Sequence, residues 1–136
     1  MLFRSEGLPK GSVVGSLSHV NFDIVTGITP QADLNVDFNT KIITTKVVLD
    51  RETVANYKIS LVAFTPVFSN FIVSVNVTDN NDNIPKFSQD VYDLKLYEES
   101  SVQHRIKATD RDFGSNSTQK YAILSGNIGS VFKLTD

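Results

Sequence analysis

The sequence predicts an all-β fold built as an antiparallel sandwich, and three observations lead to that prediction. Apolar and polar residues alternate with a period of two in several stretches, which is the pattern of half-buried strands. Helical periodicity is hard to find along the chain. Groups of Gly, Pro, Asn and Asp separate the alternating stretches, and several short strands at such spacing are typical of a sandwich.

The expected strands follow one another along the first part of the chain. The clearest alternations run over Leu34–Phe38, Tyr57–Ala63 and Val73–Val77. Thr, Val and Ile are concentrated in Ile42–Leu49, a composition that favours a strand. Turn-forming residues mark breaks at 7–11, 27–30 and 79–85.

The chain is long enough for one complete β domain and part of a second. It has 136 residues, of which 40% are hydrophobic, and all-β domains commonly need about 100 residues. Asp79–Pro85 is polar, rich in turn formers and closed by a proline, so we expect the domain junction there. The predicted organisation is a first domain over 1–78, a linker over 79–85 and a second domain over 86–136.

The second domain is expected to be incomplete. If it matches the first in length, it would continue about thirty residues beyond Asp136. Its apolar side chains should then remain partly uncovered. We expect this for Leu94, Leu96, Ile106 and Ile123.

Charge and composition exclude several classes of function. The net charge of -2 and the scattered lysines and arginines give no basic surface for nucleic acid. The sequence has no apolar run of the roughly 18 residues that a membrane span needs, and no cysteine for a disulfide scaffold. The two histidines, His19 and His104, have no cysteine beside them, which argues against zinc.

Paired acidic residues are the main candidates for a binding site. The acids in question are Glu6, Asp50, Glu52, Asp79, Asp82, Asp110 and Asp112. In an extended chain, residues two apart point the same way, so such pairs can direct two carboxylates to one point. Calcium takes six to eight oxygen ligands at about 2.3 to 2.6 Å, and these acids would suit it.

Two other interpretations of these acids fit the sequence less well. An EF-hand beginning at Asp79 would have Ile84 in place of its glycine and Asp90 in place of its final glutamate. An isolated D-x-D pair is more often a solvated or turn-capping acid than a metal site. The combination of several pairs in one chain favours calcium.

Three motifs together resemble the cadherin repeat, in their order and spacing as well as their residues. They are Leu49-Asp50-Arg51-Glu52, the run Val77–Phe87, and the run Ala108–Asn116. The resemblance covers nearly the whole chain. It implies Ig-like Greek-key β-sandwich repeats of seven strands in tandem, with the second repeat truncated and about three Ca²⁺ ions at the junction.

The resemblance also implies which residues hold the metal. Ligands are expected from the first repeat, the linker and the top of the second repeat, with Asn80 and Asn83 donating backbone carbonyls. The full set is Glu6, Asp50, Glu52, Asp79, Asn80, Asn81, Asp82, Asn83, Asp110, Asp112 and Asn116. The filled site would be nearly neutral, whereas the empty one would repel itself, so calcium is expected to stiffen the junction.

The chain departs from the family pattern at the start of the first repeat. Ser18–Thr26 lacks the D-x-D motif, and Val62–Pro66 lacks a late aspartate. The first repeat is therefore expected to be the membrane-distal tip or to follow a calcium-free linker. The absence of tryptophan excludes strand exchange by an inserted Trp, so the tip resembles protocadherins or dachsous-like cadherins. Which of Glu98 and Glu99 would serve a following junction stays open.

Two sequons indicate a glycoprotein. They are Asn76-Val77-Thr78 and Asn116-Ser117-Thr118. Asn76 alternates with two valines, which places it on the solvent face of its strand. A glycan on Asn116 would crowd the expected metal site, so Asn76 is the better candidate.

The resemblance predicts an ectodomain fragment on the extracellular face of the plasma membrane, from a single-pass protein whose transmembrane segment lies outside this chain. Its expected function is calcium-dependent cell–cell adhesion, with another cadherin ectodomain as homophilic or heterophilic partner. A calcium-stiffened spacer without an adhesive surface is the alternative. A hydrolase with paired carboxylates is disfavoured, because no nucleophile–base pair accompanies the acids.

Overall fold

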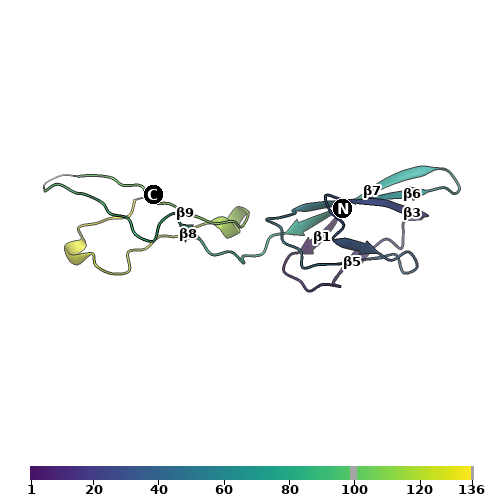
Figure 1. The fold of residues 1–136 in the computed structure, drawn as a ribbon, viewed down its shortest axis with the longest axis horizontal. Helices are drawn as coiled ribbons and strands as arrows, with labels where there is room; N and C mark the ends of the chain where they lie inside the picture. The colour runs from purple at the N-terminus through teal and green to yellow at the C-terminus, as the bar shows by residue number, and fades with distance from the viewer. Residues whose placement is uncertain (99–100, 136) are drawn as a thin grey trace. The chain divides into compact units, whose positions relative to one another are not determined.

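The computed structural model describes residues 1–98 and 101–135, so Glu99 and Asp136 lie outside the described residues. The chain divides into two compact units, Met1–Asn80 and Asn81–Asp136 (Figure 1). The division falls within the stretch 79–85 that the sequence marks as a linker. Each unit is described below by itself.

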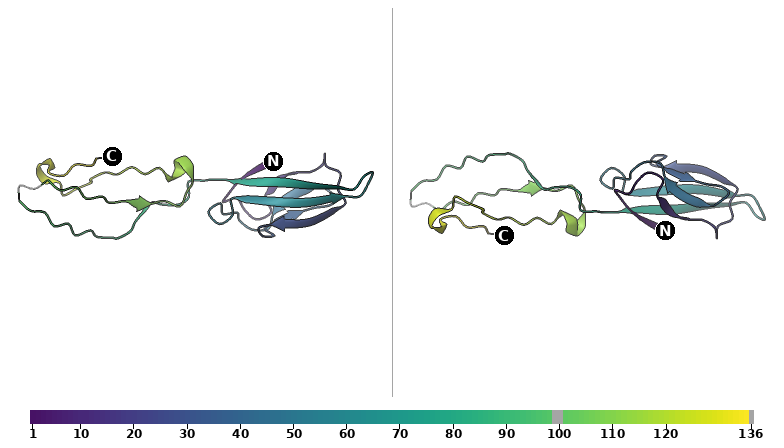
Figure 2. Two further views of the ribbon diagram at one scale, coloured as in Figure 1. Left: turned by 90° about the horizontal axis from the view of Figure 1, so that it is seen from above. Right: turned by 90° about the horizontal axis from the view of Figure 1, so that it is seen from below.

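The first unit is a sandwich of seven strands in two sheets (Figure 2). The strands are β1 (Leu2–Ser5), β2 (Val13–Ser16), β3 (Ile24–Thr29), β4 (Leu34–Val36), β5 (Ile42–Thr45), β6 (Asn56–Ala63) and β7 (Ser69–Thr78). One sheet has the order β1-β7-β6-β3 and the other the order β2-β5-β4. β1 runs parallel to β7 and the other pairs are antiparallel, which confirms the expected Greek-key sandwich.

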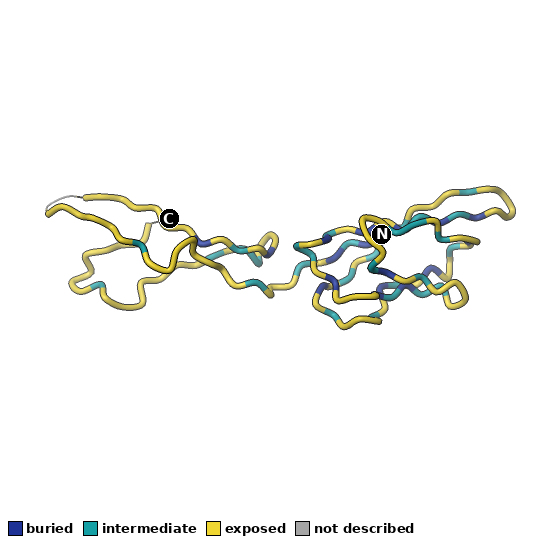
Figure 3. The backbone as a smooth tube through the Cα atoms, viewed as in Figure 1, coloured by how far each residue is buried: buried dark blue, intermediate teal, exposed yellow. Residues whose placement is uncertain are grey.

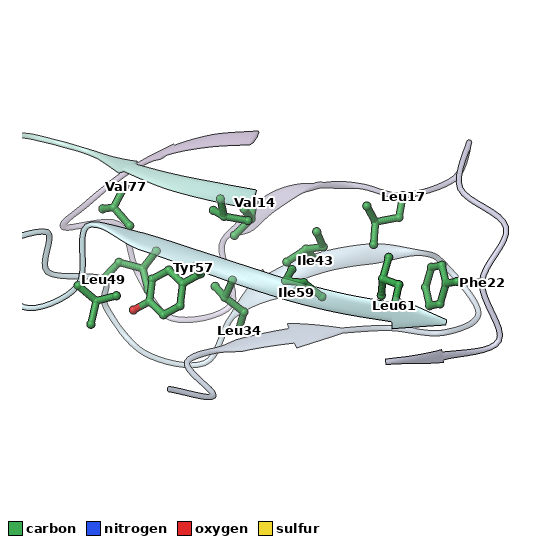
Figure 4. Packing of buried hydrophobic residues seen from close by; sticks show 12 residues of the cluster. Val14, Leu17, Phe22, Leu34, Ile43, Leu49, Tyr57, Ile59, Leu61 and Val77 are labelled. Carbon is green, nitrogen blue, oxygen red and sulfur yellow. The ribbon is translucent and has the colours of Figure 1, made fainter. Parts of the chain in front are cut away.

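Alternating residues of the central strands form the core between the two sheets (Figure 3, Figure 4). Tyr57, Ile59, Leu61 and Ala63 of β6 are all buried, as their period of two predicts. Burying a side chain such as Ile59 or Leu61 contributes about 1.5 to 3 kcal/mol relative to leaving it exposed. The core therefore fixes β6 and β7, the long strands that reach both ends of the unit.

Two strand predictions extend too far. The alternation over Leu34–Phe38 ends early, because β4 stops at Val36 and Phe38, 53% exposed, lies in the following loop. There its ring packs edge-on against Phe22, with centroids 6.0 Å apart. The strand expected over Ile42–Leu49 ends at Thr45, and the chain then turns away from the β5 ladder.

The second unit has little regular structure in its described residues. β8 (Lys86–Phe87) pairs antiparallel with β9 (Ala108–Thr109), and two short 3₁₀ helices follow, η1 (Gly114–Ser117) and η2 (Ile128–Ser130). Four apolar side chains expected to be uncovered are between 38% and 47% exposed, namely Leu94, Leu96, Ile106 and Ile123. No α-helix occurs in residues 1–98 and 101–135, in keeping with the all-β fold.

No helix that is long and apolar enough to cross a membrane is found among the described residues.

Candidate metal centre

Glu6 joins three segments at the end of the first unit where β7 leaves the sandwich. It follows β1 and is only 3% exposed. Its Oε1 accepts the backbone N–H of Asn80 and its Oε2 accepts that of Arg51, both at 2.6 Å. Bonds this short from N–H groups to a carboxylate are the strong, charge-assisted kind. Two backbone N–H groups therefore hold the Glu6 carboxyl group in place.

Glu6 stands within a cluster of three carboxylates in the first unit. Oxygens of Glu6, Glu52 and Asp79 all lie within 4.8 Å of one another. The pKa of Glu52 is raised, first by burial and then by the negative charges of the neighbouring acids. The guanidinium of Arg51 lies 4.0 Å from Asp79. The sequence-based prediction gave Arg51 no role at this site, although it stands in the sequence between the predicted ligands Asp50 and Glu52.

The Asp50 carboxylate makes different contacts from those of Glu52 and Asp79. Its carboxylate accepts the backbone N–H of Thr53 at 3.1 Å and the Thr53 hydroxyl at 2.8 Å. Its own carbonyl accepts the N–H of Val54 at 2.9 Å. Asp50 thus caps the turn that carries Glu52, and it lies outside the group of three carboxylates described above. Its charge still contributes to raising the pKa of Glu52.

The second unit holds its own set of polar residues around Asp112, which is 6% exposed. Asn83 donates its side-chain amide to Asp112 at 2.6 Å and to Asp82 at 2.9 Å, and its backbone N–H reaches Asp112 at 3.2 Å. Asp110 accepts the backbone N–H of Asp112 at 2.9 Å. Four predicted ligands are therefore gathered here, and Asn83 adds a side-chain role to its expected backbone one.

The remaining predicted ligands are less enclosed. Asn80 and Asn81 are exposed, and Asn80 uses its backbone N–H to bond Glu6. Asn116 is half-buried in η1, where its N–H donates to the carbonyl of Phe113 at 3.3 Å. Asn76, the sequon residue of β7, lies between two buried valines, so its side chain points away from the core.

The donor chemistry of both sets fits a hard cation. Two oxygens bound to one ion at about 2.4 Å lie at most about 4.8 Å apart, so the spacing of Glu6, Glu52 and Asp79 permits shared coordination. The donors are carboxylate and amide oxygens, without histidine or cysteine, which suits calcium better than zinc. The pKa of Glu52 is raised first by burial and then by repulsion from the neighbouring acids, and a bound cation would relieve that repulsion.

Among the described residues, the opposite end of the first unit has no comparable cluster of three acids. A hollow of about 380 Å³ there is lined by residues such as His19 and Phe71, with no carboxylate in its described lining. Lys41 lies 3.8 Å from the ring centroid of Phe22 and 3.9 Å from that of Phe38, and it donates to the Phe22 carbonyl at 3.2 Å. This end already contains a cation of its own.

Several curated proteins are similar to the chain in sequence. Protein dachsous of Drosophila melanogaster is 39% identical over 115 residues, covering 82% of this chain and 3% of that protein. Human Protocadherin-10 is 35% identical over 147 residues, covering 96% of this chain and 14% of its own length. Human Cadherin EGF LAG seven-pass G-type receptor 1 is 36% identical over 102 residues, covering 68% of this chain and 3% of that protein. The chain thus spans a small part of each relative.

Solved structures agree with these relatives. The protocadherin GammaB4 extracellular domain matches 98% of this chain and 25% of its own, with a TM-score of 0.80 and 15% identity, which speaks for the fold alone. The protocadherin gammaB7 EC3-6 structure matches 85% of this chain and 29% of its own, with a TM-score of 0.65 and 29% identity. No family model matches the chain.

Proposed function

The chain belongs to the cadherin superfamily, and on that premise we propose that it is part of an extracellular ectodomain that mediates calcium-dependent cell–cell adhesion. Cadherin repeats bind Ca²⁺. The finer proposal is that the residues of the linker and its two flanking units bind about three calcium ions and that this binding stiffens the junction.

The observation that carries the proposal is the convergence of Glu6, Glu52 and Asp79 within 4.8 Å. These acids come from three distant parts of the sequence. The guanidinium of Arg51 lies 4.0 Å from Asp79. Three negative charges gathered in this way repel one another, because burial weakens the screening by water, and a bound cation would relieve that repulsion.

The proposed ligands fall into the two sets described above. Glu6, Glu52 and Asp79 would serve from the first unit, and Asp82, Asp110 and Asp112 from the second. A bound calcium ion would supply positive charge and oxygen coordination. The chain itself contributes positioning: the N–H groups of Arg51 and Asn80 fix Glu6, and the amide of Asn83 holds Asp112.

The proposed partner is another cadherin ectodomain, on the same or an apposed cell. The fragment would reach the membrane only through a segment outside residues 1–136. No catalytic role is proposed for the acids. A calcium-stiffened spacer without adhesive surface remains the second candidate, and self-association of the chain separates the two.

Calcium titration by calorimetry, combined with thermal melting in calcium and in chelator, tests the metal site. We expect binding with a dissociation constant on the order of 10⁻⁴ to 10⁻³ M and a higher melting temperature in calcium. Asp82→Ala should abolish most of this gain. Asp93→Ala is the matched control, because Asp93 is an exposed acid of the same unit outside the proposed set.

An unchanged melting temperature in calcium, together with no heat of binding, would reject the metal site. Equal losses in Asp82→Ala and Asp93→Ala would indicate a general charge effect and would also reject it. A loss confined to Asp82→Ala supports specific coordination.

The proposed glycan site is Asn76 in preference to Asn116. Asn76 points away from the core, whereas Asn116 stands near the proposed ligands of the second unit. Mass spectrometry of the chain secreted from animal cells should find a glycan on Asn76 that disappears in Thr78→Ala. A glycan on Asn116 alone would overturn this preference.

A further inference from the structure

We propose that the first unit self-associates through an apolar patch on the outer face of the sheet β1-β7-β6-β3, with a second copy of this chain as the partner. The patch consists of Ile24, Val62, Phe64, Phe68 and Ile72, and is called the hairpin patch below. The inference rests on the proposed adhesive function, because it names the surface through which that function would act.

The strand register places the hairpin patch on one face. Ile24 of β3 is paired with Val62 of β6, and residues directly opposite in an antiparallel pair share a face. Ile72 of β7 is paired with Ser60, which makes it a diagonal neighbour of Val62. The neighbours of Val62 in β6, Leu61 and Ala63, are buried, so this shared face is the outer one.

The hairpin loop extends the same surface. Phe64 and Phe68 stand on the β6–β7 connection with ring centroids 6.1 Å apart. Figure 2 shows this hairpin projecting past the ends of the neighbouring strands. Phe64 is 52% exposed, Phe68 61% and Ile72 67%, so the apolar atoms face solvent in a single copy.

The part of the outer face nearer the linker is mostly polar, and Phe3 of β1, which is paired with Asn76, is its exposed aromatic exception. Further along the same strands, towards the linker, the outward positions are occupied by Lys58, Ser74, Asn76 and Thr29. An outer face of a sandwich is ordinarily solvated and polar throughout. The apolar half is therefore the part that needs a physical reason, and a partner surface provides one.

The size of the patch suits a weak contact between copies. An aromatic side chain buries roughly 150 to 250 Å². Two phenylalanines and three aliphatic residues, about half exposed, offer roughly 400 Å² per copy. Two such faces together bury about 800 Å², which is below the standard size of a stable interface and typical of a transient one. Many weak contacts on apposed cell surfaces add up by multivalency.

The charges beside the patch identify the partner as a second copy. Asp23 borders it at the hairpin end, next to Ile24, and Lys58 borders it at the linker end, paired with Thr29. A two-fold axis near Ile72 would bring the Asp23 of each copy towards the Lys58 of the other. Such a surface is complementary to itself in both charge and polarity.

Sedimentation velocity of the full chain at rising concentration measures the association. Ile72→Lys should weaken self-association at least about tenfold, because it places a charge at the centre of the patch. Ser74→Lys is the matched control. It lies on the same strand and face, two residues away in the polar half, and should leave association nearly unchanged. Thermal melting of both variants checks that each is folded.

A charge-reversal pair tests the two-fold arrangement. Lys58→Asp alone places two acids opposite one another and should weaken self-association. Asp23→Lys alone places two lysines opposite one another and should weaken it as well. A mixture of the two variants should associate more tightly than either variant alone, because both contacts are then attractive. If the mixture associates no more tightly than either variant alone, the two-fold arrangement of the copies is rejected.

The outcomes separate this inference from the calcium proposal. Ile72→Lys should reduce association and leave the calcium-dependent rise in melting temperature intact. Asp82→Ala should reduce that rise in melting temperature and leave association intact. Wild-type chain that stays monomeric at all concentrations, or Ile72→Lys that associates like the wild type, would overturn the hairpin patch whether or not calcium binds.

Discussion

The two ends of the first unit share the long strands β6 and β7 but gather different side chains, carboxylates at one end and aromatic rings with a lysine at the other. At the linker end, three loops and strand ends bring together Glu6, Glu52 and Asp79. At the hairpin end, the corresponding loops bring together two aromatic rings and the ammonium of Lys41. One sandwich can thus present an anionic end and an end with its own cation, because the loops are independent of the core that positions them.

The physical difference lies in what balances the charge. Two carboxylates about 5 Å apart repel by about 1 kcal/mol even at the dielectric constant of water. Under the proposed function, an ion from solution would balance the carboxylates of the linker end. Among the described residues, no cluster of three acids is found at the hairpin end, where the Lys41 ammonium lies against two aromatic rings and donates to the Phe22 carbonyl. Variants at each end should accordingly differ in their response to calcium.

Glu6→Ala should have the largest effect. It leaves the N–H groups of Arg51 and Asn80 without their carboxylate acceptor, so we expect a loss of about 3 kcal/mol in the free energy of unfolding in chelator. In calcium the loss should be larger, because a proposed ligand is removed as well. Urea unfolding with and without calcium measures both quantities.

Glu6→Gln provides the control for that prediction. It retains an oxygen acceptor but loses the negative charge, so the loss in chelator should shrink while the response to calcium stays weak. An equal response to calcium in Glu6→Gln and the wild type would remove Glu6 from the proposed ligand set.

Lys41→Met should have a smaller effect at the other end of the unit. It removes the cation between two rings and the hydrogen bond to the Phe22 carbonyl while keeping most of the aliphatic stem. We expect a loss of about 2 kcal/mol, identical in calcium and in chelator. A loss that depended on calcium would contradict the contrast between the two ends. Lys41→Arg, which keeps the charge, should recover part of the stability.

Strand periodicity was sufficient to predict the sandwich of the first unit. Tyr57, Ile59 and Leu61 alternate over a long stretch, and a period of two has one structural interpretation at that length. Periodicity failed where strands end. Phe38 continues the alternation of β4, yet the carboxylate of Asp37 accepts the N–H groups of Asn39 and Thr40 and starts a turn instead. Such local side-chain bonds leave no trace in an apolar pattern.

The candidate site was predictable in its residue types but not in its internal arrangement. Spacing of two placed Asp50 and Glu52 together, whereas the structure uses Asp50 to cap the turn beneath Glu52. The side-chain bonds of Asn83 to Asp82 and Asp112 depend on residues distant in sequence. Lys41 belongs to no recognisable sequence motif. Its ammonium lies over the rings of Phe22 and Phe38 because the folded chain brings their loops together.

Tyr57→Phe tests whether every acid at the linker end belongs to the calcium site. The Tyr57 hydroxyl donates to Asp33 at 2.8 Å, and removing it should cost about 1 kcal/mol with no dependence on calcium. A calcium-dependent loss would mean that Asp33 is coupled to the metal site.

The pH dependence of the same variant gives a second measurement. Burial, and then the Asp33 carboxylate, raise the pKa of Tyr57 above its ordinary value of about 10. The unfolded tyrosine therefore loses its proton first, and the stabilisation is complete below about pH 10 and declines as the pH rises further. The difference in stability between wild type and Tyr57→Phe should shrink above that pH.

Asp37→Asn should have the smallest effect and tests an acid of the hairpin end. The pKa of Asp37 is lowered, chiefly by the backbone N–H and side chain of Thr40, with the N–H of Asn39 adding to it. A lowered pKa means that the carboxylate stabilises the fold above its unfolded pKa of about 4 and that this contribution is lost on acidification. Urea unfolding of wild type and Asp37→Asn should therefore converge as the pH falls below about 4. Their small difference at neutral pH should be the same with and without calcium, because this acid serves a turn of the backbone. A response to calcium would show that the hairpin end also binds the ion, and the contrast between the two ends would then rest on Lys41 alone.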